Sequence, residues 1–363
     1  MPKESQISFG KFDNDANDLA RKNLFDLSFP EAVNSSTSSI EHYQWKFAKF
    51  PAEPSSYEYI ATEMTMEGSK LIGYYAALPF EYKIGDKMLR CGMVCDVMTH
   101  PESRGKGVFT GIGKYATDSL RQSGVAFVSG YPVRPEVIPG HLKVGWRIVQ
   151  KMPMFAKLVS VYSVLPMSVK YLSIFVNPIL NLVHSWSHIG LGSYKTQVLS
   201  PAEFFHLNDF SYFIKLWISE QSNALIKDID FLKWRTGAPH AEYKFLTLRL
   251  NGNLVGYSLV RPTAIRGYQS LAILDISILS EHFKGSRKLH STIYELAKAL
   301  KKDLIVCISS RKWAKNYCFL SSFYLATTTV FSLIIKKLQV ELPDENFYFS
   351  DMWHLFWIDS DDL

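Results

Sequence analysis

The chain has 363 residues, a length that accommodates two domains of ordinary size. Hydrophobic residues make up 47% and aromatic residues 14%, which allows large cores and excludes a globally disordered chain. The net charge of +6 suits an anionic small ligand. No nucleic-acid-binding motif accompanies that charge, so we expect no nucleic-acid partner.

The four cysteines, Cys91, Cys95, Cys307 and Cys318, match no zinc-binding spacing. We therefore expect no metal site and reduced thiols. The first residues lack the apolar region of a signal peptide, and this favours a cytoplasmic location.

Hydrophobic periodicity predicts the elements of the first half in chain order. A strand at Ile7–Phe9 precedes a helix from Ala16 to Leu27, which Pro30 closes. Three strands are then expected, at residues 57–66, 71–78 and 87–98.

The segment from Met93 to Ala116 reads as a strand, a glycine-rich turn and an amphipathic helix. Gly105 and Gly107 allow the backbone to approach a ligand closely. The first amides of the helix have no partner inside it and lie at its positive end. Together with the charges of Arg104 and Lys106, this pattern predicts a pyrophosphate site.

The sequence Arg104-Gly-Lys-Gly-Val-Phe resembles the Arg/Gln-x-x-Gly-x-Gly/Ala acyl-CoA loop of the GNAT N-acetyltransferases. A strand at Val125–Ser129 follows the helix, and His141-Leu-Lys-Val-Gly-Trp resembles the Tyr-Glu-Lys-Leu-Gly-Phe segment of that family. The resemblance implies an α/β fold of mixed α+β type, with bent mixed sheets flanked by helices. Acetyl-CoA is the implied cofactor. Phe109 departs from the family, which has a small residue there.

The resemblance implies three groups of site residues. Backbone donors at the strand end would polarise the thioester, and the loop would hold the cofactor. The residues predicted for these two roles are Val97, Met98, Thr99, Arg104, Gly105, Lys106, Gly107, Val108, Phe109 and Thr110. Tyr131 and Arg134 follow the next strand, where a substrate would enter; the alternative for both is an ordinary loop position.

Asp96 and His141 are the catalytic candidates. Asp96 is the only acid in its strand and could deprotonate the amine; the alternative is a structural partner of another group. His141 takes the place of the family's tyrosine and could protonate the departing thiolate. The alternative for His141 is a capping or packing role at the start of a helix.

The second half repeats the first in an ordered series of matches. Trp45-Lys46 recurs as Trp234-Arg235, Glu58-Tyr59 as Glu242-Tyr243, Leu71-Ile-Gly-Tyr as Leu254-Val-Gly-Tyr, and Asp96 as Asp275. The glycine-rich turn is replaced by His282-Phe-Lys-Gly-Ser. A helix at 289–300 and a strand at 304–308 follow.

These matches predict a tandem GNAT-like protein. Residues 1–151 would form a GNAT domain with the acyl-CoA loop, 152–195 an apolar connector, and 196–363 a degenerate GNAT-like domain. We expect the connector to be helical and packed between the domains. The alternative is a cationic helix that lies on a membrane surface, so that residues 152–192 make a peripheral membrane contact.

The expected function is acyl-CoA-dependent transfer of an acetyl group to the amine of a small molecule, with an amino sugar or a nucleotide-linked sugar favoured by the basic charge. The alternative is a non-catalytic CoA-binding or scaffold protein. It is supported by Phe109 and by the absence of the glycine-rich loop from the second half of the sequence. Peptidoglycan-type aminoacyl transfer is a third reading, which the intact loop disfavours. The sequence leaves the acceptor, the acyl chain length and the oligomeric state open.

Overall fold

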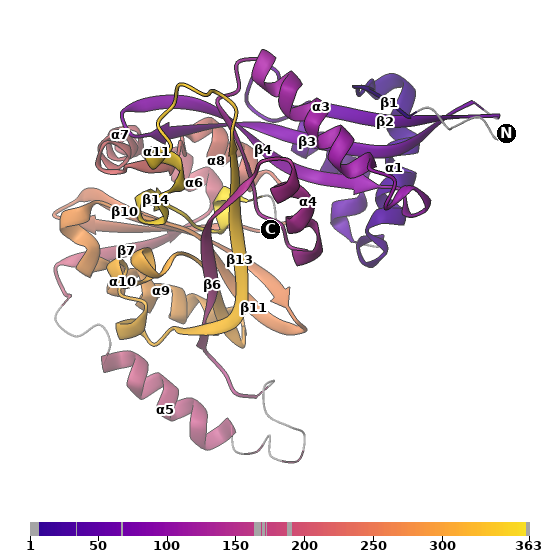
Figure 1. Ribbon diagram of the computed structural model, residues 1–363. Coiled ribbons are helices and arrows are strands. Elements are labelled where there is room, and N and C mark those ends of the chain that lie inside the picture. The colour runs from indigo at the N-terminus through magenta and orange to yellow at the C-terminus, as the bar shows by residue number, and fades with distance from the viewer. Residues whose placement is uncertain are drawn as a thin grey trace. The chain divides into compact units, whose positions relative to one another are not determined.

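The computed structural model describes residues 7–33, 35–66, 68–162, 168, 171, 173–186 and 191–360. The chain divides into two compact units, which are described separately (Figure 1). Unit 1 comprises residues 1–149, 237–240 and 332–350, and unit 2 comprises residues 150–236, 241–331 and 351–363.

Unit 1 is built on a mixed sheet in the order β1-β2-β3-β4-β5-β13. Each neighbouring pair is antiparallel except β4 and β5, which are parallel because α3 connects them. The strands are β1 (Ile7–Lys11), β2 (Tyr57–Thr65), β3 (Gly68–Ile84), β4 (Lys87–Thr99), β5 (Phe127–Gly130) and β13 (Leu325–Lys337), whose residues from Ile334 pair with β5.

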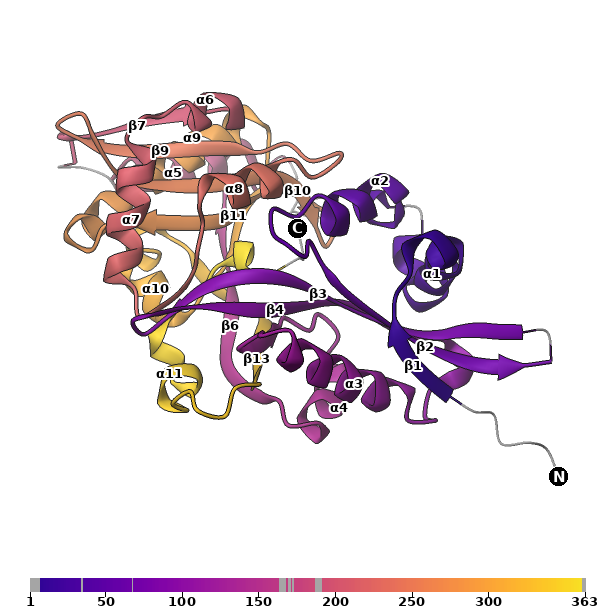
Figure 2. The same ribbon diagram turned by 90° about the horizontal axis from the view of Figure 1, so that it is seen from above.

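The helices of unit 1 include the predicted amphipathic helix, which Figure 2 shows along β3 and β4 as α3. Its buried face (Val108, Ile112, Ala116 and Leu120) joins side chains of β2, β3, β4 and β5 in the core of the unit. The helices are α1 (Asn14–Ser28), α2 (Ile40–Tyr43), the π-helical η3 (Gln44–Ala48), α3 (Val108–Gln122), α4 (Ile138–Lys143) and α11 (Glu345–Tyr348), with short 3₁₀ turns that include η1 (Pro30–Ala32), η4 (Pro101–Ser103) and η5 (Pro135–Val137).

Unit 2 repeats this plan with a mixed sheet in the order β7-β9-β10-β11-β12-β6. Its pairs are antiparallel except β11 and β12, which α9 connects in parallel. The strands are β6 (Arg147–Leu158), β7 (Tyr194–Leu199), β9 (Lys244–Leu250), β10 (Asn253–Ile265), β11 (Tyr268–Ile278) and β12 (Leu304–Ile308), with the short parallel pair β8 (Asn223–Leu225) and β14 (Trp353–His354). The helices are α5 (Ser173–Trp186), α6 (Pro201–Phe205), α7 (Phe210–Glu220), α8 (Ile229–Thr236), α9 (Ser286–Ala299) and α10 (Arg311–Asn316).

The two units have the same strand order and directions, as a duplicated chain requires, but their last strands are exchanged. Residues 334–337 of β13, from the second half of the chain, pair with β5 of unit 1. Residues 154–158 of β6, from the first half, pair with β12 of unit 2. Each compact unit therefore contains chain from both sequence halves. The boundaries proposed at residues 151 and 195 stay a prediction about the sequence repeat.

The connector differs from the expected helical segment in its first part. Residues 152–158 belong to strand β6, and both faces of this stretch are largely buried. An apolar run that is buried on both sides has no period that distinguishes strand from helix, which explains the error. The later part includes α5, while residues 163–167, 169–170, 172 and 187–190 lie outside the described residues. None of the helices in the described part of the chain combines the length and hydropathy needed to cross a bilayer.

Candidate functional site

The end of β4 carries a β-bulge next to the glycine-rich turn. Ala76 pairs with Cys95 and Tyr74 with Met98, so two residues of β4 oppose one of β3. One of the two, Asp96, has a positive φ of 47°. The parallel pairing of β4 with β5 ends at Val94 and Gly130, before the bulge. The last residues of β4 therefore extend beyond the end of β5.

The turn after β4 leads directly into α3. Gly105 and Gly107 have φ values of 76° and 80°, in the left-handed region that favours glycine. A Cβ placed on either would meet no heavy atom of the described residues within 4 Å, so this backbone is open to a ligand. The first α-helical bond runs from Gly111 N to Gly107 O at 2.9 Å. The three preceding amides, of residues 108–110, consequently have no acceptor within the helix and lie at its positive end.

A cavity of about 970 Å³ joins the strand end, the turn and the start of α3. It has the size of a small-molecule site. Every residue predicted to bind the cofactor lines it except Lys106, which is exposed. The other lining residues come from the end of α1, η4, η5 and α4, and they are Ser28, Phe29, Ser103, Arg134, Glu136, Val137, Gly140 and Lys143.

The charged groups of the cavity wall are mostly cationic. Arg104, Arg134 and Lys143 line the cavity, and Glu136 is the one carboxylate among the described residues of its wall. The hydroxyls of Ser28 and Thr99 are buried and have no hydrogen-bond partner among the described residues. Because buried polar groups are normally paired, these two hydroxyls are available to a bound ligand. The wall thus offers positive charge, open amides and free hydroxyls, a set that fits the phosphates and amides of coenzyme A.

Asp96 is held by an ion pair and does not line the cavity. Lys46 of η3 donates to its carboxylate, with Nζ and Oδ1 2.9 Å apart, and the Lys46 side chain is buried. The pair joins the bulge to η3. This geometry favours the structural role that the sequence left open for Asp96, and its assignment as the catalytic base stays a prediction.

His141 is buried behind Phe109, away from the cavity wall. Its ring contacts the edges of Phe109 and Trp146, with ring centroids 5.0 and 4.8 Å apart. Burial lowers the pKa of His141 to about 4, so that the ring is neutral near pH 7. A neutral imidazole that does not reach the cavity favours the packing alternative, and its assignment as the general acid stays a prediction.

Phe109, the residue that departs from the family pattern, fits because α4 has a glycine opposite it. A Cβ on Gly140 would lie 2.6 Å from the Phe109 ring, closer than any side chain could be placed. Phe109 therefore occupies space that Gly140 leaves, and its ring forms part of the wall.

The two predicted substrate residues are placed differently. Arg134 lines the cavity, and its guanidinium donates to the carbonyl of Ser28 at 3.1 Å and to the carboxylate of Glu31. It therefore fixes the end of α1 against the segment after β5. Tyr131 is buried and is not part of the wall, so its role in substrate binding stays a prediction.

The matching turn of unit 2 is filled by protein. Gly285 has an ordinary negative φ of −64°, and a Cβ there would lie 2.9 Å from both Tyr194 and Leu248. Asp275, the counterpart of Asp96, is fully buried and accepts hydrogen bonds from Lys227 and Tyr257, each at 2.7 Å. The turn of unit 2 therefore lacks the open backbone that Gly105 and Gly107 give to the turn of unit 1.

Sequence reasoning missed the part of the wall that comes from the end of α1 and from α4. Ser28, Phe29 and Val137 belong to no motif, and Lys143 lies in the His141–Trp146 segment without having been proposed for the site; only the tertiary fold brings these residues to the loop. Lys46 could have been found, because a lone aspartate in an apolar strand requires a cation or donors. Within the described residues, no group of three potential metal ligands gathers.

Comparison with known proteins agrees with this geometry. Residues 22–149 match the family described as the acetyltransferase (GNAT) domain. No curated protein sequence matches the chain. A probable N-acyltransferase from Enterococcus faecalis has a similar structure, with a TM-score of 0.64 and 11% identity over 93% of this chain and 74% of that chain.

Two further structures are similar over 93% or more of this chain. N-myristoyltransferase from Saccharomyces cerevisiae, solved with myristoyl-CoA and inhibitors, has a TM-score of 0.60 and 10% identity over 100% of this chain and 88% of that chain. A tandem GNAT protein from the clavulanic acid biosynthesis pathway has a TM-score of 0.56 and 10% identity over 93% of this chain and 100% of that chain. Residues 22–149 therefore match the acetyltransferase (GNAT) domain family, within a chain whose fold is similar to that of a tandem GNAT protein.

Proposed function

We propose that the protein is an N-acetyltransferase that transfers an acetyl group from acetyl-CoA to the amine of a small molecule. The observation that carries the proposal is the open turn at Gly105 and Gly107, which shares one cavity with the free end of β4. Acetyl-CoA would supply the activated thioester.

The residues of the turn and the strand end have complementary parts in this proposal. Backbone amides at the start of α3, with Arg104 beside them, would bind the pyrophosphate. The Thr99 hydroxyl would bond the pantetheine. Backbone amides of β4 past the bulge would stabilise negative charge on the reacting carbonyl.

Glu136 would take the proton from the incoming amine, directly or through a water molecule. It is exposed at η5 and is the carboxylate of the described wall, whereas Asp96 is committed to Lys46. Arg134, two residues before Glu136, donates to the carbonyl of Ser28, and the Ser28 hydroxyl would hydrogen-bond the acceptor. A polar acceptor such as an amino sugar or a nucleotide-linked sugar is supported by this cationic, hydroxyl-bearing wall.

A non-catalytic CoA-binding protein is the second candidate. It is favoured by the position of the two predicted catalytic residues, because neither Asp96 nor His141 lines the cavity. The two candidates differ in one measurable property, which is release of free thiol from acetyl-CoA that depends on an amine.

The test is a thiol-release screen of the full chain with an amine library that includes amino sugars. Acetyl-CoA and a long-chain acyl-CoA are compared, because acyl length is a separate part of the proposal. We expect amine-dependent release with acetyl-CoA, lost in Glu136→Gln without loss of CoA binding. CoA binding without release for any amine would support the second candidate, and preference for the long-chain donor would refute acetyl specificity.

A further inference from the structure

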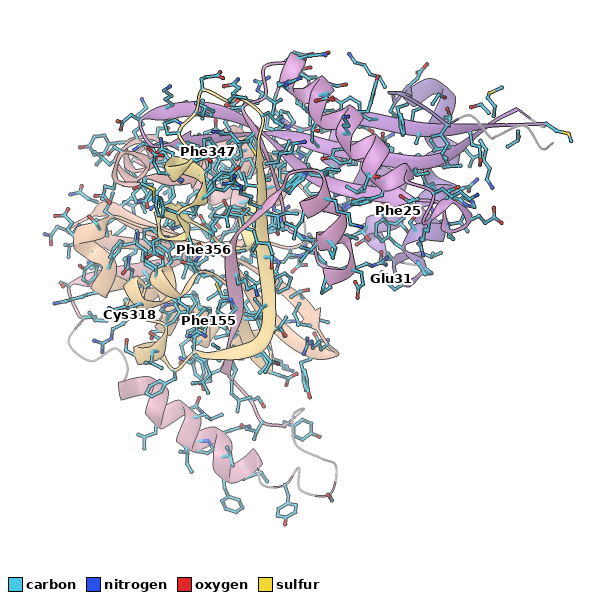
Figure 3. All side chains as sticks on the ribbon, viewed as in Figure 1. Phe25, Glu31, Phe155, Cys318, Phe347 and Phe356 are labelled. Carbon is cyan, nitrogen blue, oxygen red and sulfur yellow. The ribbon has the colours of Figure 1, made fainter. Side chains whose placement is uncertain are left out.

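The helix α5 of unit 2 has an apolar outer face. Ile174, Phe175, Ile179 and Leu182 are between 58% and 72% exposed, and Pro178 is exposed with them. Their spacing of i, i+1, i+4, i+5 and i+8 places all five on one side of the helix. Figure 3 shows side chains extending from this helix into open space.

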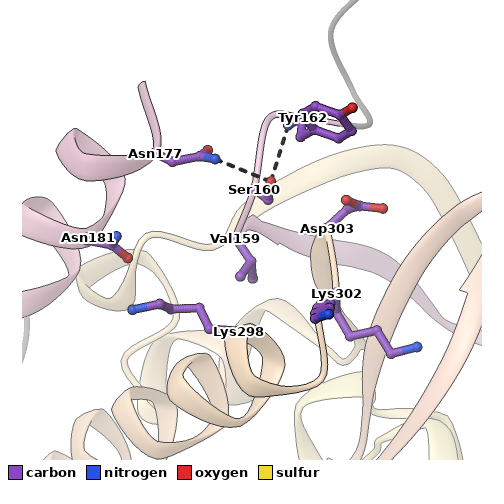
Figure 4. A pocket seen from close by; sticks show the side chains of 9 residues that line it. Val159, Ser160, Tyr162, Asn177, Asn181, Lys298, Lys302 and Asp303 are labelled. Carbon is purple, nitrogen blue, oxygen red and sulfur yellow. Dashed lines mark hydrogen bonds between the residues drawn. The ribbon is translucent and has the colours of Figure 1, made fainter. Parts of the chain in front are cut away.

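The other side of α5 carries two asparagines that hydrogen-bond to the protein, with the partly buried Val176 and Leu180 beside them. Asn177 accepts a hydrogen bond from Val161 N at 3.0 Å, and Asn181 accepts one from the Tyr294 hydroxyl at 3.1 Å. Both asparagines line a cavity of about 450 Å³ (Figure 4). The exposed side of α5 is therefore apolar, whereas the exposed side of a surface helix is usually polar. Such an exposed apolar face marks an interaction surface.

The charge beside α5 is positive. Lys298, Lys301 and Lys302, at the end of α9, line the same cavity as the two asparagines. Lys298 is paired with Glu295, and Lys302 donates to the Gln269 side chain. Asp303 is the only acid in the described cavity wall, and its side chain accepts from Gln269 N. Residues 137–202, which contain α5, include no aspartate or glutamate. Counted against Glu295 and Asp303, the three lysines leave one positive charge in surplus, and Lys301 and Lys302 are the two that form no ion pair among the described residues.

We propose that α5 docks unit 2 onto an anionic lipid bilayer. The apolar side chains of α5 would enter the boundary between headgroups and acyl chains, while Lys301 and Lys302 contact lipid phosphates. Tyr162 and Tyr171, which precede the helix in sequence and are 56% and 63% exposed, are the residue type found at such boundaries. A bilayer is favoured over a protein partner because it takes both an apolar helix side and adjacent lysines without needing a shaped surface. The helix lies on the membrane and does not span it.

The experiment is flotation of the full chain with vesicles of phosphatidylcholine alone or mixed with phosphatidylglycerol. We expect binding to the anionic vesicles. This binding should weaken at high salt, because salt screens the attraction between the lysines and the lipid phosphates. Phe175→Glu should weaken binding by roughly tenfold or more, since it removes apolar burial and adds a repelled charge. Lys301→Gln with Lys302→Gln should weaken binding to anionic vesicles only.

The matched control is Tyr212→Glu. Tyr212 lies on α7 of the same unit and is 69% exposed, close to the 68% of Phe175, so the substitution adds the same charge to an equally exposed aromatic site. It should bind vesicles as the wild type does. Binding that Phe175→Glu leaves unchanged would overturn the proposal. So would an absence of flotation at low salt, or a dimer that Phe175→Glu dissociates without any vesicle binding, which would identify a second copy as the occupant.

Discussion

The burial of His141 predicts a specific dependence of stability on pH. Its pKa is lowered to about 4 in the folded protein, against about 6.5 for an exposed histidine. Between these values the unfolded chain binds a proton that the folded chain does not. The contribution of His141 to stability is therefore complete above pH 6.5, is lost as the pH falls below 6.5, and stops changing below about pH 4.

The magnitude follows from the two pKa values. From pH 7.5 to pH 5, the wild type should lose about 2 kcal/mol of stability through this one ring. The replacement His141→Gln cannot titrate and should lack this loss. Three further histidines with lowered pKa values, His100, His290 and His354, remain in both proteins, so the difference between wild type and variant isolates His141.

The assay is hydrogen exchange of peptides from α3 and α4, measured for both proteins at pH 7.5 and pH 5 and corrected for intrinsic exchange. It reports the local free energy of opening, which is preferable for a chain with two units. An NMR titration of labelled histidines measures the pKa directly. Turnover of His141→Gln should stay within a few-fold of wild type across neutral pH.

A pKa near 6.5 for His141, together with equal pH dependence of stability in the two proteins, would contradict the burial of this ring. If His141 is instead the general acid, turnover of the variant should fall by roughly two to four powers of ten with CoA affinity unchanged. That combination would restore the catalytic assignment and place the ring in contact with the cavity.

Three further outcomes are expected. Calorimetry should show one CoA site per chain, and Gly107→Asp should abolish it. Gly267→Asp, which introduces the same side chain at a similarly open glycine with a φ of 83°, should keep it. Two sites would contradict the conclusion that protein fills the matching turn of unit 2. Residues 1–150 expressed alone should aggregate or bind hydrophobic dyes, because β5 loses its pairing with β13; a soluble, CoA-binding monomer would argue against the strand exchange. Lys46→Met should destabilise the protein in thermal unfolding by roughly 1–3 kcal/mol, because it leaves the Asp96 carboxylate unpaired. Adding Asp96→Asn should recover part of the loss. An unchanged melting temperature would show that the ion pair does not stabilise the fold.

The sequence alone determined the local elements that carry the loop. The strand at β4, the turn at Gly105 and Gly107, and the helix α3 follow from periodicity and glycine chemistry, because these act over a few neighbouring residues. The duplication could also be read from sequence, since it is recorded as ordered matches along the chain, and the equal strand orders of the two units agree with it.

The features that depend on contacts between residues far apart in the sequence are set by the tertiary structure. The sequence repeat does not predict which of the strands β6 and β13 pairs with which sheet, because the hydrophobic patterns of both strands fit both sheet edges. The pairing of Asp96 with Lys46 and the burial of His141 behind Phe109 depend on which elements meet, 50 residues apart in the first case. The charge and exposure of a side chain at the site are set by these neighbours, and for that reason the sequence could locate the cavity but could not assign its chemistry.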